Sequence, residues 1–234
     1  MMSQEQTLPK VIFFDAVGTL FGVKGSVGKI YQQLASQHGV VVSAKDLDRA
    51  FGYAFTNSPT LAFETTNSIP QQEYQWWYRV VKLTFQEAKV FHKFTNFELF
   101  FQELYVYFAT KKPWNIYLDT VESLRCWQQK KVELGIISNF DTRIYQVLEL
   151  LKLKSYFSSI TISSESGSAK PDSLIFEKAL RKHNCQPEQA WHIGDSLRED
   201  YQGANAVGIK AFLLKRDKQK TQVKNQLPNL NSLG

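Results

Sequence analysis

The sequence predicts an α/β protein in which an open parallel-sheet core is interrupted by an inserted helical block. The run from Val11 to Phe14 is apolar at every position, as in a central parallel strand that helices cover on both faces. Residues 22–110 then show helical patterns and no convincing strand. From Pro113 onward strand and helix patterns alternate again, which is typical of a sheet built from crossover units.

Length and composition bound the class of protein. With 234 residues, of which 43% are hydrophobic and 21% charged, the chain is long enough to bury a sizeable core. Its apolar runs are far shorter than the roughly 20 residues of a membrane helix. The N-terminal segment MMSQEQTLPK is too polar for a signal peptide. We therefore expect a soluble cytoplasmic protein with no membrane partner.

The cysteines and the net charge discriminate little between functions. Cys126 and Cys185 lie in separate helical patterns with no CxxC motif, so we expect reduced, structural thiols. A formal charge of +6 modestly favours anionic partners, whether phosphorylated metabolites or nucleic acid. Residues 216–234 are rich in Lys, Gln and Asn, and we expect a solvated polar tail there in preference to a nucleic-acid arm.

The inserted block is predicted to be helical. Its opening glycines lack the spacing of a phosphate-binding loop, so this stretch is interpreted as a hinge and a helix start. Seventeen of the 32 aromatic residues fall between Phe51 and Phe108. Helix packing explains most of them, and a substrate pocket or a homodimer face stays open for the rest. The expected helices cover residues 26–38, 71–91 and 96–109, with Ser43 capping another and Thr95 with Glu98 forming a capping box.

The second half is predicted to alternate helices and strands. Pro171 and Asp172 are expected in the first turn of their helix, because proline is accepted there and a carboxylate favours that end. Gly208 marks the end of the last helix before the final strand. The expected helices cover residues 120–129, a segment after Asp141 and residues 171–183, and the expected strands cover 132–137, 160–162, 190–193 and 209–214.

Side chains of the kind that phosphoryl chemistry needs follow several predicted strands. The first strand ends at Asp15, and Gly18 in the turn after it lets backbone approach an anionic group. Because ligands in open α/β sheets bind outside the carboxyl ends of the strands, polar residues there are expected to meet in one crevice. The other residues of this kind are Ser138, Asn139, Lys170, Asp195 and Asp200.

Four short motifs occur in a fixed order along the chain: DAVGTL from Asp15, SN from Ser138, KP from Lys170 and GDSLRED from Gly194. Together they resemble the haloacid dehalogenase (HAD) superfamily of hydrolases and phosphatases, and they span most of the chain. The resemblance implies a Rossmann-like HAD core of residues 1–21 and 111–215. It also implies that residues 22–110 form a helical cap domain that closes over the site.

One position departs from the family pattern. Most phosphatases of the superfamily carry a second aspartate two residues after the first, and this chain has Val17 there. The resemblance is therefore closest to a subgroup with DAVGTL at this site. Val17 cannot donate a proton to a leaving group, and such a donor typically contributes ~10² to 10⁴ in rate. Three alternatives are open. Water or a cap residue donates the proton in place of the aspartate, the substrate has a good leaving group, or the protein binds phosphorylated ligands with little turnover.

Separate roles in phosphoryl transfer can be assigned to these residues. Asp15 is the candidate nucleophile, which would form an aspartyl-phosphate. Ser138 and the amide of Asn139 would hydrogen-bond the phosphoryl group, and Lys170 would offset the negative charge. The expected cofactor is Mg²⁺, because it prefers oxygen ligands. Its ligands would be Asp15, Asp195, Asp200 and, by the resemblance, the backbone carbonyl of Val17.

The leading hypothesis is a Mg²⁺-dependent, HAD-like phosphatase whose partner is a small phosphorylated metabolite. The alternative is a non-catalytic protein that binds phosphorylated ligands and keeps the metal site. A dehalogenase or a phosphonatase is a third reading, although the superfamily's dehalogenases are metal-free. Asp141 is interpreted as a helix cap and His192 as a packed or hydrogen-bonded core residue. A phosphonatase would need a Schiff-base lysine from the cap, for which the candidates are Lys24, Lys29, Lys45, Lys82, Lys89 and Lys93.

Overall fold

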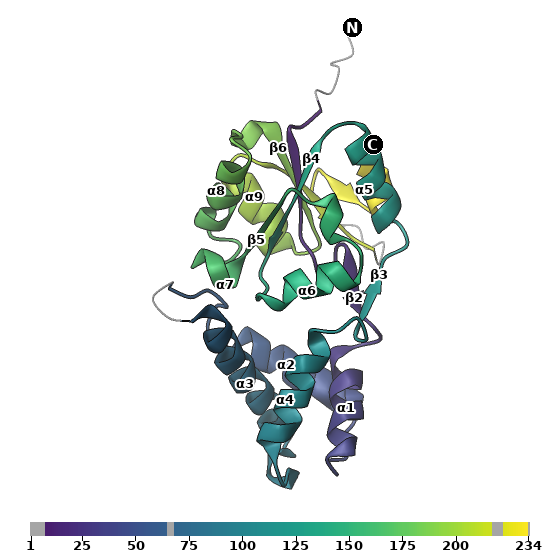
Figure 1. Cartoon of the computed structure of the whole chain (residues 1–234), viewed down its shortest axis with the longest axis vertical. Helices are drawn as coiled ribbons and strands as arrows, with labels where there is room; N and C mark the ends of the chain where they lie inside the picture. The colour runs from purple at the N-terminus through teal and green to yellow at the C-terminus, as the bar shows by residue number, and fades with distance from the viewer. Residues whose placement is uncertain (1–7, 65–67, 217–221, 234) are drawn as a thin grey trace, which may run out of the picture.

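A six-stranded parallel sheet forms the centre of the protein, which we describe from a computed structural model covering residues 8–64, 68–216 and 222–233 (Figure 1). The strand order is β5-β4-β1-β6-β7-β8, and every neighbouring pair is parallel. This arrangement confirms the predicted α/β class. The strands are β1 (Val11–Phe14), β4 (Glu133–Ser138), β5 (Ser159–Ile162), β6 (Ala190–Gly194), β7 (Lys210–Leu214) and β8 (Gln226–Leu227).

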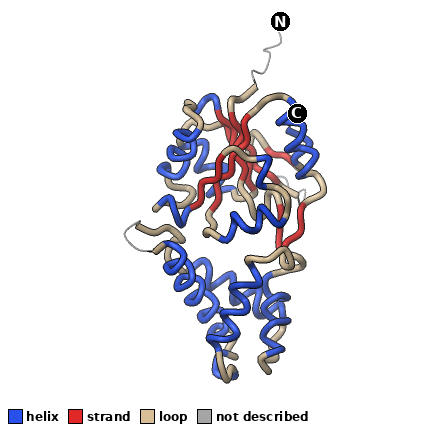
Figure 2. The backbone as a smooth tube through the Cα atoms, viewed as in Figure 1, coloured by secondary structure: helices blue, strands red, loops and turns tan. Residues whose placement is uncertain are grey.

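Helices cover both faces of the sheet, so β1 in its middle is fully buried (Figure 2). Ile12 and Phe14 pack with one set of helices, and Val11 and Phe13 pack with the other. This two-sided burial explains why the strand is apolar at every position. One face carries α5 (Thr120–Gln129) and α6 (Arg143–Leu150), and the other carries α8 (Ser173–Lys182) and α9 (Gly203–Ala206). The short helix α7 (Ser163–Ser166) follows β5.

Four helices form a cap below the sheet in Figure 1, and their core is largely aromatic. Phe85 is fully buried there, and its ring lies 5.0 Å from that of Phe94 and 5.1 Å from that of Phe100. Helix packing therefore accounts for many of the aromatic residues in this block. The helices are α1 (Val27–Gln37), α2 (Ala44–Thr56), α3 (Ile69–Glu87) and α4 (Phe97–Phe108), with a 3₁₀ turn at Phe91–Lys93.

The two connections between core and cap form a short antiparallel ribbon, β2 (Phe21–Val23) with β3 (Trp114–Ile116). The sequence predicts only a hinge at this point. Three-residue strands are too short to show a clear periodic pattern, and the ribbon exists because residues about 90 positions apart pair with each other. It fixes where the cap joins the core.

Two predicted helix starts are confirmed by side-chain caps, and two others need correction. Ser26 and Ser43 accept hydrogen bonds from backbone N–H groups three residues later. The capping box at Thr95 is wrong, because α4 begins one residue later and Asn96 accepts the N–H of Leu99 at 3.1 Å. Helix α8 likewise starts after Asp172, whose carboxylate caps it, so the preceding proline lies outside the first turn.

The C-terminal segment differs from the solvated tail that its composition predicts. Leu227, Leu230 and Leu233 are buried, and β8 extends the main sheet. The backbone N–H of Leu230 donates to Asp119 at 2.7 Å. These leucines are three residues apart and pack against the core. The polar residues between them dominate the composition of the segment, so composition alone does not reveal the apolar contact. Residues 217–221 and 234 of the predicted tail lie outside the described residues.

Within the part of the chain that the structure describes, no helix has the length and apolar character that crossing a membrane requires.

Candidate active site

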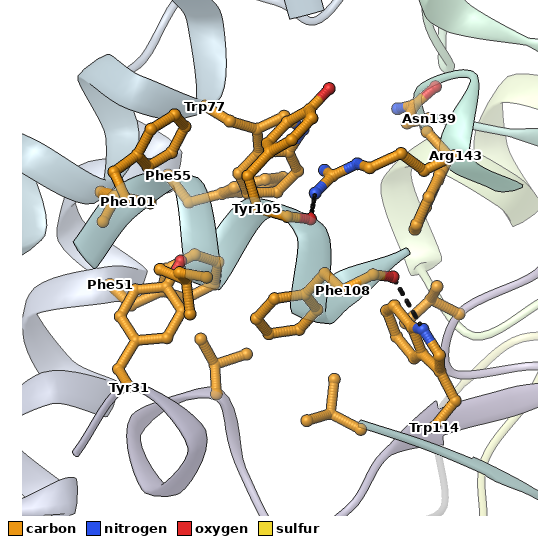
Figure 3. Close-up of a pocket in the computed structure, with 16 residues that line it drawn as sticks. Tyr31, Phe51, Phe55, Trp77, Phe101, Tyr105, Phe108, Trp114, Asn139 and Arg143 are labelled. Atoms are coloured by element: carbon orange, nitrogen blue, oxygen red, sulfur yellow. Dashed lines mark hydrogen bonds between the residues drawn. The ribbon is translucent and has the colours of Figure 1, made fainter. Parts of the chain in front are cut away.

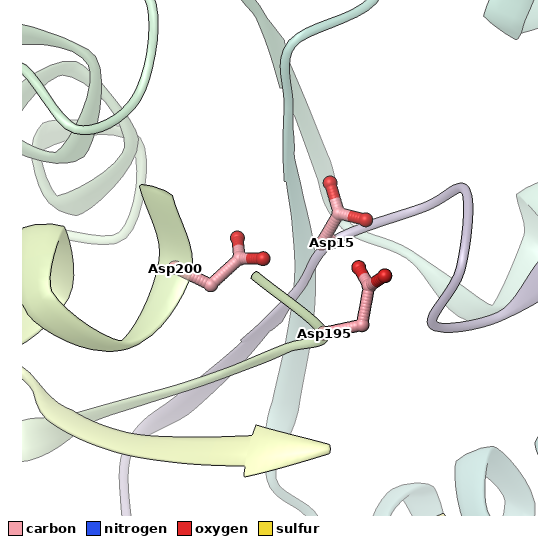
Figure 4. Close-up of side chains that lie close together, drawn as sticks. All are labelled: Asp15, Asp195 and Asp200. Atoms are coloured by element: carbon pink, nitrogen blue, oxygen red, sulfur yellow. The ribbon is translucent and has the colours of Figure 1, made fainter. Parts of the chain in front are cut away.

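Three predicted site residues meet at the carboxyl edge of the sheet. Asp15 follows β1, Ser138 ends β4 and Asp195 follows β6. Because these strands are parallel neighbours, their ends place the side chains together. Figure 4 shows the carboxylates of Asp15, Asp195 and Asp200 facing one another, and one oxygen of each lies within 4.8 Å of the other two.

Lys170 is the cation of this cluster. Its Nζ lies 2.7 Å from Oδ1 of Asp15 and 2.5 Å from Oδ1 of Asp200, and its side chain is almost fully buried. Burial alone would lower the pKa of Lys170, but the two carboxylates raise it above its ordinary value, so the ammonium stays charged. Asn139 holds the lysine in place, since its side-chain amide exchanges two hydrogen bonds with the Lys170 backbone, at 2.8 and 2.9 Å.

Asp200 is bound on both carboxylate oxygens by this chain's own donors. Oδ1 contacts Lys170 and lies 2.9 Å from Nε2 of His192, and Oδ2 accepts the Ser196 N–H at 3.0 Å. Burial would raise the pKa of Asp200, but Lys170 and His192 hold it below its ordinary value. The prediction that His192 is a hydrogen-bonded core residue is confirmed, and its contact places it directly behind the site.

Asp195 carries the uncompensated charge of the cluster. Burial, followed by repulsion from Asp15 and Asp200, raises its pKa to about 7. Three carboxylates therefore share one ammonium among the described residues of the cluster, because burial lowers the pKa of His192 and keeps that ring neutral. An all-oxygen donor set with excess negative charge fits a hard divalent cation.

Two glycines make room for these carboxylates. A Cβ on Gly18, whose φ is +96°, would lie 2.5 Å from Oδ2 of Asp195. A Cβ on Gly194 would lie 2.0 Å from Cγ of Asp200. Gly18 was predicted to allow close approach of an anionic group, and the group it meets is Asp195 itself. The need for glycine at 194 was missed, because it arises from a residue that returns to the strand end six positions later.

The loop that follows Ser138 and Asn139 also holds the cap. The carboxylate of Asp141 accepts the N–H of Arg143, the first residue of α6, at 3.0 Å, although the N-cap position itself belongs to Thr142. It also accepts the indole N–H of Trp77, on cap helix α3, at 2.6 Å. From the same helix, buried Glu73 accepts the backbone N–H of Thr142 at 2.9 Å. These contacts between cap and core were not predicted, since nothing in the local pattern of α3 distinguishes Glu73 from a solvent-facing glutamate.

Two adjoining hollows lie at the site, and the carboxylates line one of them. A polar cleft of about 950 Å³ contains Asp15, Lys170 and Asp195. An apolar cavity of about 220 Å³ lies between cap and core (Figure 3). Val17, Phe55, Asn139 and Phe140 line both. Among the described residues, none of the six cap lysines considered for Schiff-base chemistry lines either hollow.

Comparisons with known proteins agree with this architecture. Residues 9–208 match the family model described as haloacid dehalogenase-like hydrolase. A Bos taurus relative, "Haloacid dehalogenase-like hydrolase domain-containing protein 3", is 31% identical over 212 residues, covering 88% of this chain and 81% of its own. The crystal structure of a HAD phosphatase from Thermococcus onnurineus superposes with a TM-score of 0.65 at 20% identity, covering 96% of this chain and 95% of its own. A dehalogenase structure gives 0.72 at 19% identity, covering 97% and 96%.

Proposed function

The chain belongs to the haloacid dehalogenase-like hydrolase family, and from that premise we propose that it is a Mg²⁺-dependent phosphatase of small phosphorylated metabolites. The observation that carries the proposal is the cluster of Asp15, Asp195 and Asp200 around one lysine, because three adjoining carboxylates form the oxygen donor set that suits Mg²⁺. Similarity to solved phosphatase and dehalogenase structures is about equal, so the fold does not choose between these reactions. We also assign the chain to the DAVGTL subgroup.

Asp15 would act as the nucleophile. Its Oδ1 accepts hydrogen bonds from Lys170 Nζ at 2.7 Å and from Ser138 Oγ at 3.2 Å, so we assign the attack on phosphorus to Oδ2. Burial raises the pKa of Asp15, and the charge of Lys170 opposes that rise. The lysine thereby favours the ionised carboxylate that an aspartyl-phosphate mechanism needs.

The phosphoryl group would lie in the polar cleft. The Ser138 hydroxyl and the backbone amide of Asn139 are the proposed donors to its oxygens, because the side-chain amide of Asn139 is already engaged with the Lys170 backbone. Asp15, Asp195 and Asp200, with the Val17 carbonyl, would hold Mg²⁺. When bound, the ion would offset the charge on the phosphate oxygens.

Val17 favours a second candidate function, a non-catalytic protein that binds phosphorylated ligands. The valine leaves the usual position of the acid without a proton donor. The two candidates differ in one observable, because only the phosphatase forms a covalent phosphoenzyme. Dehalogenase and phosphonatase activities are less supported, the latter because the cap lysines lie away from both hollows.

Hydrolysis of 4-nitrophenyl phosphate with and without Mg²⁺ tests the proposal, since its leaving group needs no acid. Mg²⁺-dependent turnover is expected in wild type and its loss in Asp15→Asn, with phosphorylated Asp15 detected by mass spectrometry after acid quench. Asp46→Asn, at a partly exposed position in the first turn of α2, is the matched control and should keep wild-type activity. Mg²⁺ binding without turnover or phosphoenzyme would replace the phosphatase with the binding protein.

A further inference from the structure

The apolar cavity between cap and core has the size and lining of a site for a single aromatic ring. Its volume is about 220 Å³, and a buried apolar cavity of roughly 150 Å³ suffices to bind benzene. Rings from α2, α3 and α4 surround it, and Figure 3 shows those of Phe51, Phe101 and Phe108 around the open space. Such walls favour an apolar, flat occupant.

The polar side chains on the cavity wall present no free charge to a ligand. Each nitrogen of the Arg143 guanidinium already donates a hydrogen bond, two of them to Asp141 and the third to the carbonyl oxygen of Tyr105 at 3.1 Å. The guanidinium also lies 3.9 Å from the centre of the Tyr105 ring. Burial raises the pKa values of Tyr31 and Tyr105, the latter to about 12, so both phenols stay neutral and are poor acids. An anionic group would lose its hydration there without gaining a charge partner.

The cavity adjoins the polar cleft that contains Asp15. Val17 is two residues from Asp15 and lines both the cavity and the polar cleft, as do Asn139 and Phe140. A phosphoryl group at Asp15 would therefore have its ester oxygen beside Val17 and the rest of the molecule in the cavity. Among the described residues lining the cavity there is no carboxyl group to protonate that oxygen.

We propose that the substrate is an aryl phosphate whose single aromatic ring occupies this cavity, a proposal that rests on the phosphatase function proposed above. Oδ2 of Asp15 forms a bond to phosphorus as the bond from phosphorus to the phenolic oxygen breaks. That oxygen keeps the electron pair, leaves as a phenolate and takes a proton from water. A second water then hydrolyses the aspartyl-phosphate to phosphate and free Asp15, and the hydroxide left by the first water takes up the proton that this step releases. A phenolate leaves readily without an acid. The aromatic wall, which would bind the ring, and Val17, which cannot donate a proton, therefore both favour an aryl phosphate as substrate.

Two activated substrates separate ring recognition from chemistry. 4-Nitrophenyl phosphate has a ring and acetyl phosphate has none, while both have good leaving groups. Val27→Phe adds a side chain to the cavity wall and should lower kcat/KM for the aryl substrate at least about tenfold while leaving acetyl phosphate within about twofold. Val41→Phe makes the same change at an 81% exposed position and should alter neither.

A measurement on wild type covers the case in which Val27→Phe does not fold. Phenol should inhibit 4-nitrophenyl phosphate hydrolysis competitively, whereas glycerol at the same concentration should not. Equal effects of Val27→Phe on both substrates, or no inhibition by phenol, would overturn the aryl assignment even with Asp15-dependent acetyl phosphate turnover intact. Absence of turnover with both substrates would instead remove the phosphatase function on which the assignment rests.

Discussion

Glu73, fully buried on a cap helix, accepts two hydrogen bonds from Thr142 at the start of a core helix, one from its backbone N–H and one from its hydroxyl. Thr142 lies three residues after Asn139, in the loop that carries the proposed phosphate-binding groups. The cap is therefore attached to the same loop that shapes the site. Stability of the whole fold and the geometry of the site should respond together to changes at this contact.

Replacing Glu73 with alanine should destabilise the protein. The substitution leaves the partly buried N–H and hydroxyl of Thr142 without acceptors, and an unsatisfied buried polar group costs about 1–3 kcal/mol. Urea unfolding would measure the loss. Glu87→Ala, at an exposed position on the same helix, is the control and should change the unfolding free energy by less than about 0.5 kcal/mol. Equal stability of the two variants would contradict the prediction.

Glu73 should also make stability depend on pH. Burial raises its pKa above the ordinary 4.5, so the native state keeps the proton to a higher pH than the unfolded chain does. The resulting stabilisation is fully present below the ordinary pKa and is lost as pH rises through the raised one. Unfolding free energies of wild type and Glu73→Gln, measured from about pH 4 to about pH 8, should therefore diverge, with wild type falling relative to the variant. A constant difference would show that the carboxyl group does not titrate abnormally.

Introducing an acid at Val17 should extend activity to alkyl phosphates. In Val17→Asp the new carboxyl group would lie beside Asp15 in a partly buried position, where desolvation and like charge favour its protonated form. A gain of at least about tenfold in kcat/KM is expected for an alkyl phosphate, within the ~10² to 10⁴ that general acids supply. The aryl substrate should change little. Val17→Asn has the same size but no such proton, and the same gain from it would rule out acid catalysis.

Removing the ammonium of Lys170 should abolish most activity. Lys170→Met leaves Asp15, Asp195 and Asp200 mutually repulsive, and the phosphoryl group loses a charge partner. A fall in kcat on the order of 10²–10³ is expected from loss of one such electrostatic contact. Steady-state kinetics with Mg²⁺ would measure it, and exposed Lys45→Met is the control. Turnover that survives the change would show that the lysine is only structural.

Local sequence patterns predict the core elements well, because each carries a complete periodic signal. The helix at Thr120–Gln129 has the predicted bounds, and β1 is buried on both faces as its composition requires. The ribbon β2–β3 and strand β8 could not be predicted in the same way. Each strand is two or three residues long. The ribbon depends on pairing between segments distant in sequence, and β8 depends on leucines spread through a polar segment.

In the candidate site, too, some features can be predicted from the sequence and others cannot. Motif order predicts that Asp15, Ser138, Lys170, Asp195 and Asp200 converge, and the structure brings all five together. Motifs do not reveal how the surrounding residues are used, because those contacts join different elements. Three such contacts are seen only in the folded structure. Asn139 binds the Lys170 backbone, Glu73 accepts hydrogen bonds from Thr142, and Arg143 in the cavity wall is paired with Asp141.

Gly194 offers a test of how tightly the carboxylate cluster is packed. A Cβ there would lie 2.0 Å from Cγ of Asp200, so Gly194→Ala must displace that carboxylate from Lys170 and His192. Overpacking of this kind typically costs about 1–3 kcal/mol. Kinetics and urea unfolding should show loss of both turnover and stability. Gly52→Ala is the matched control, because a Cβ at that position in α2 has no neighbour within 4 Å and alanine is favoured over glycine in a helix by roughly 0.5–1 kcal/mol. If Gly194→Ala kept full activity, Asp200 would have a second position compatible with the reaction, and its contact with His192 would be dispensable.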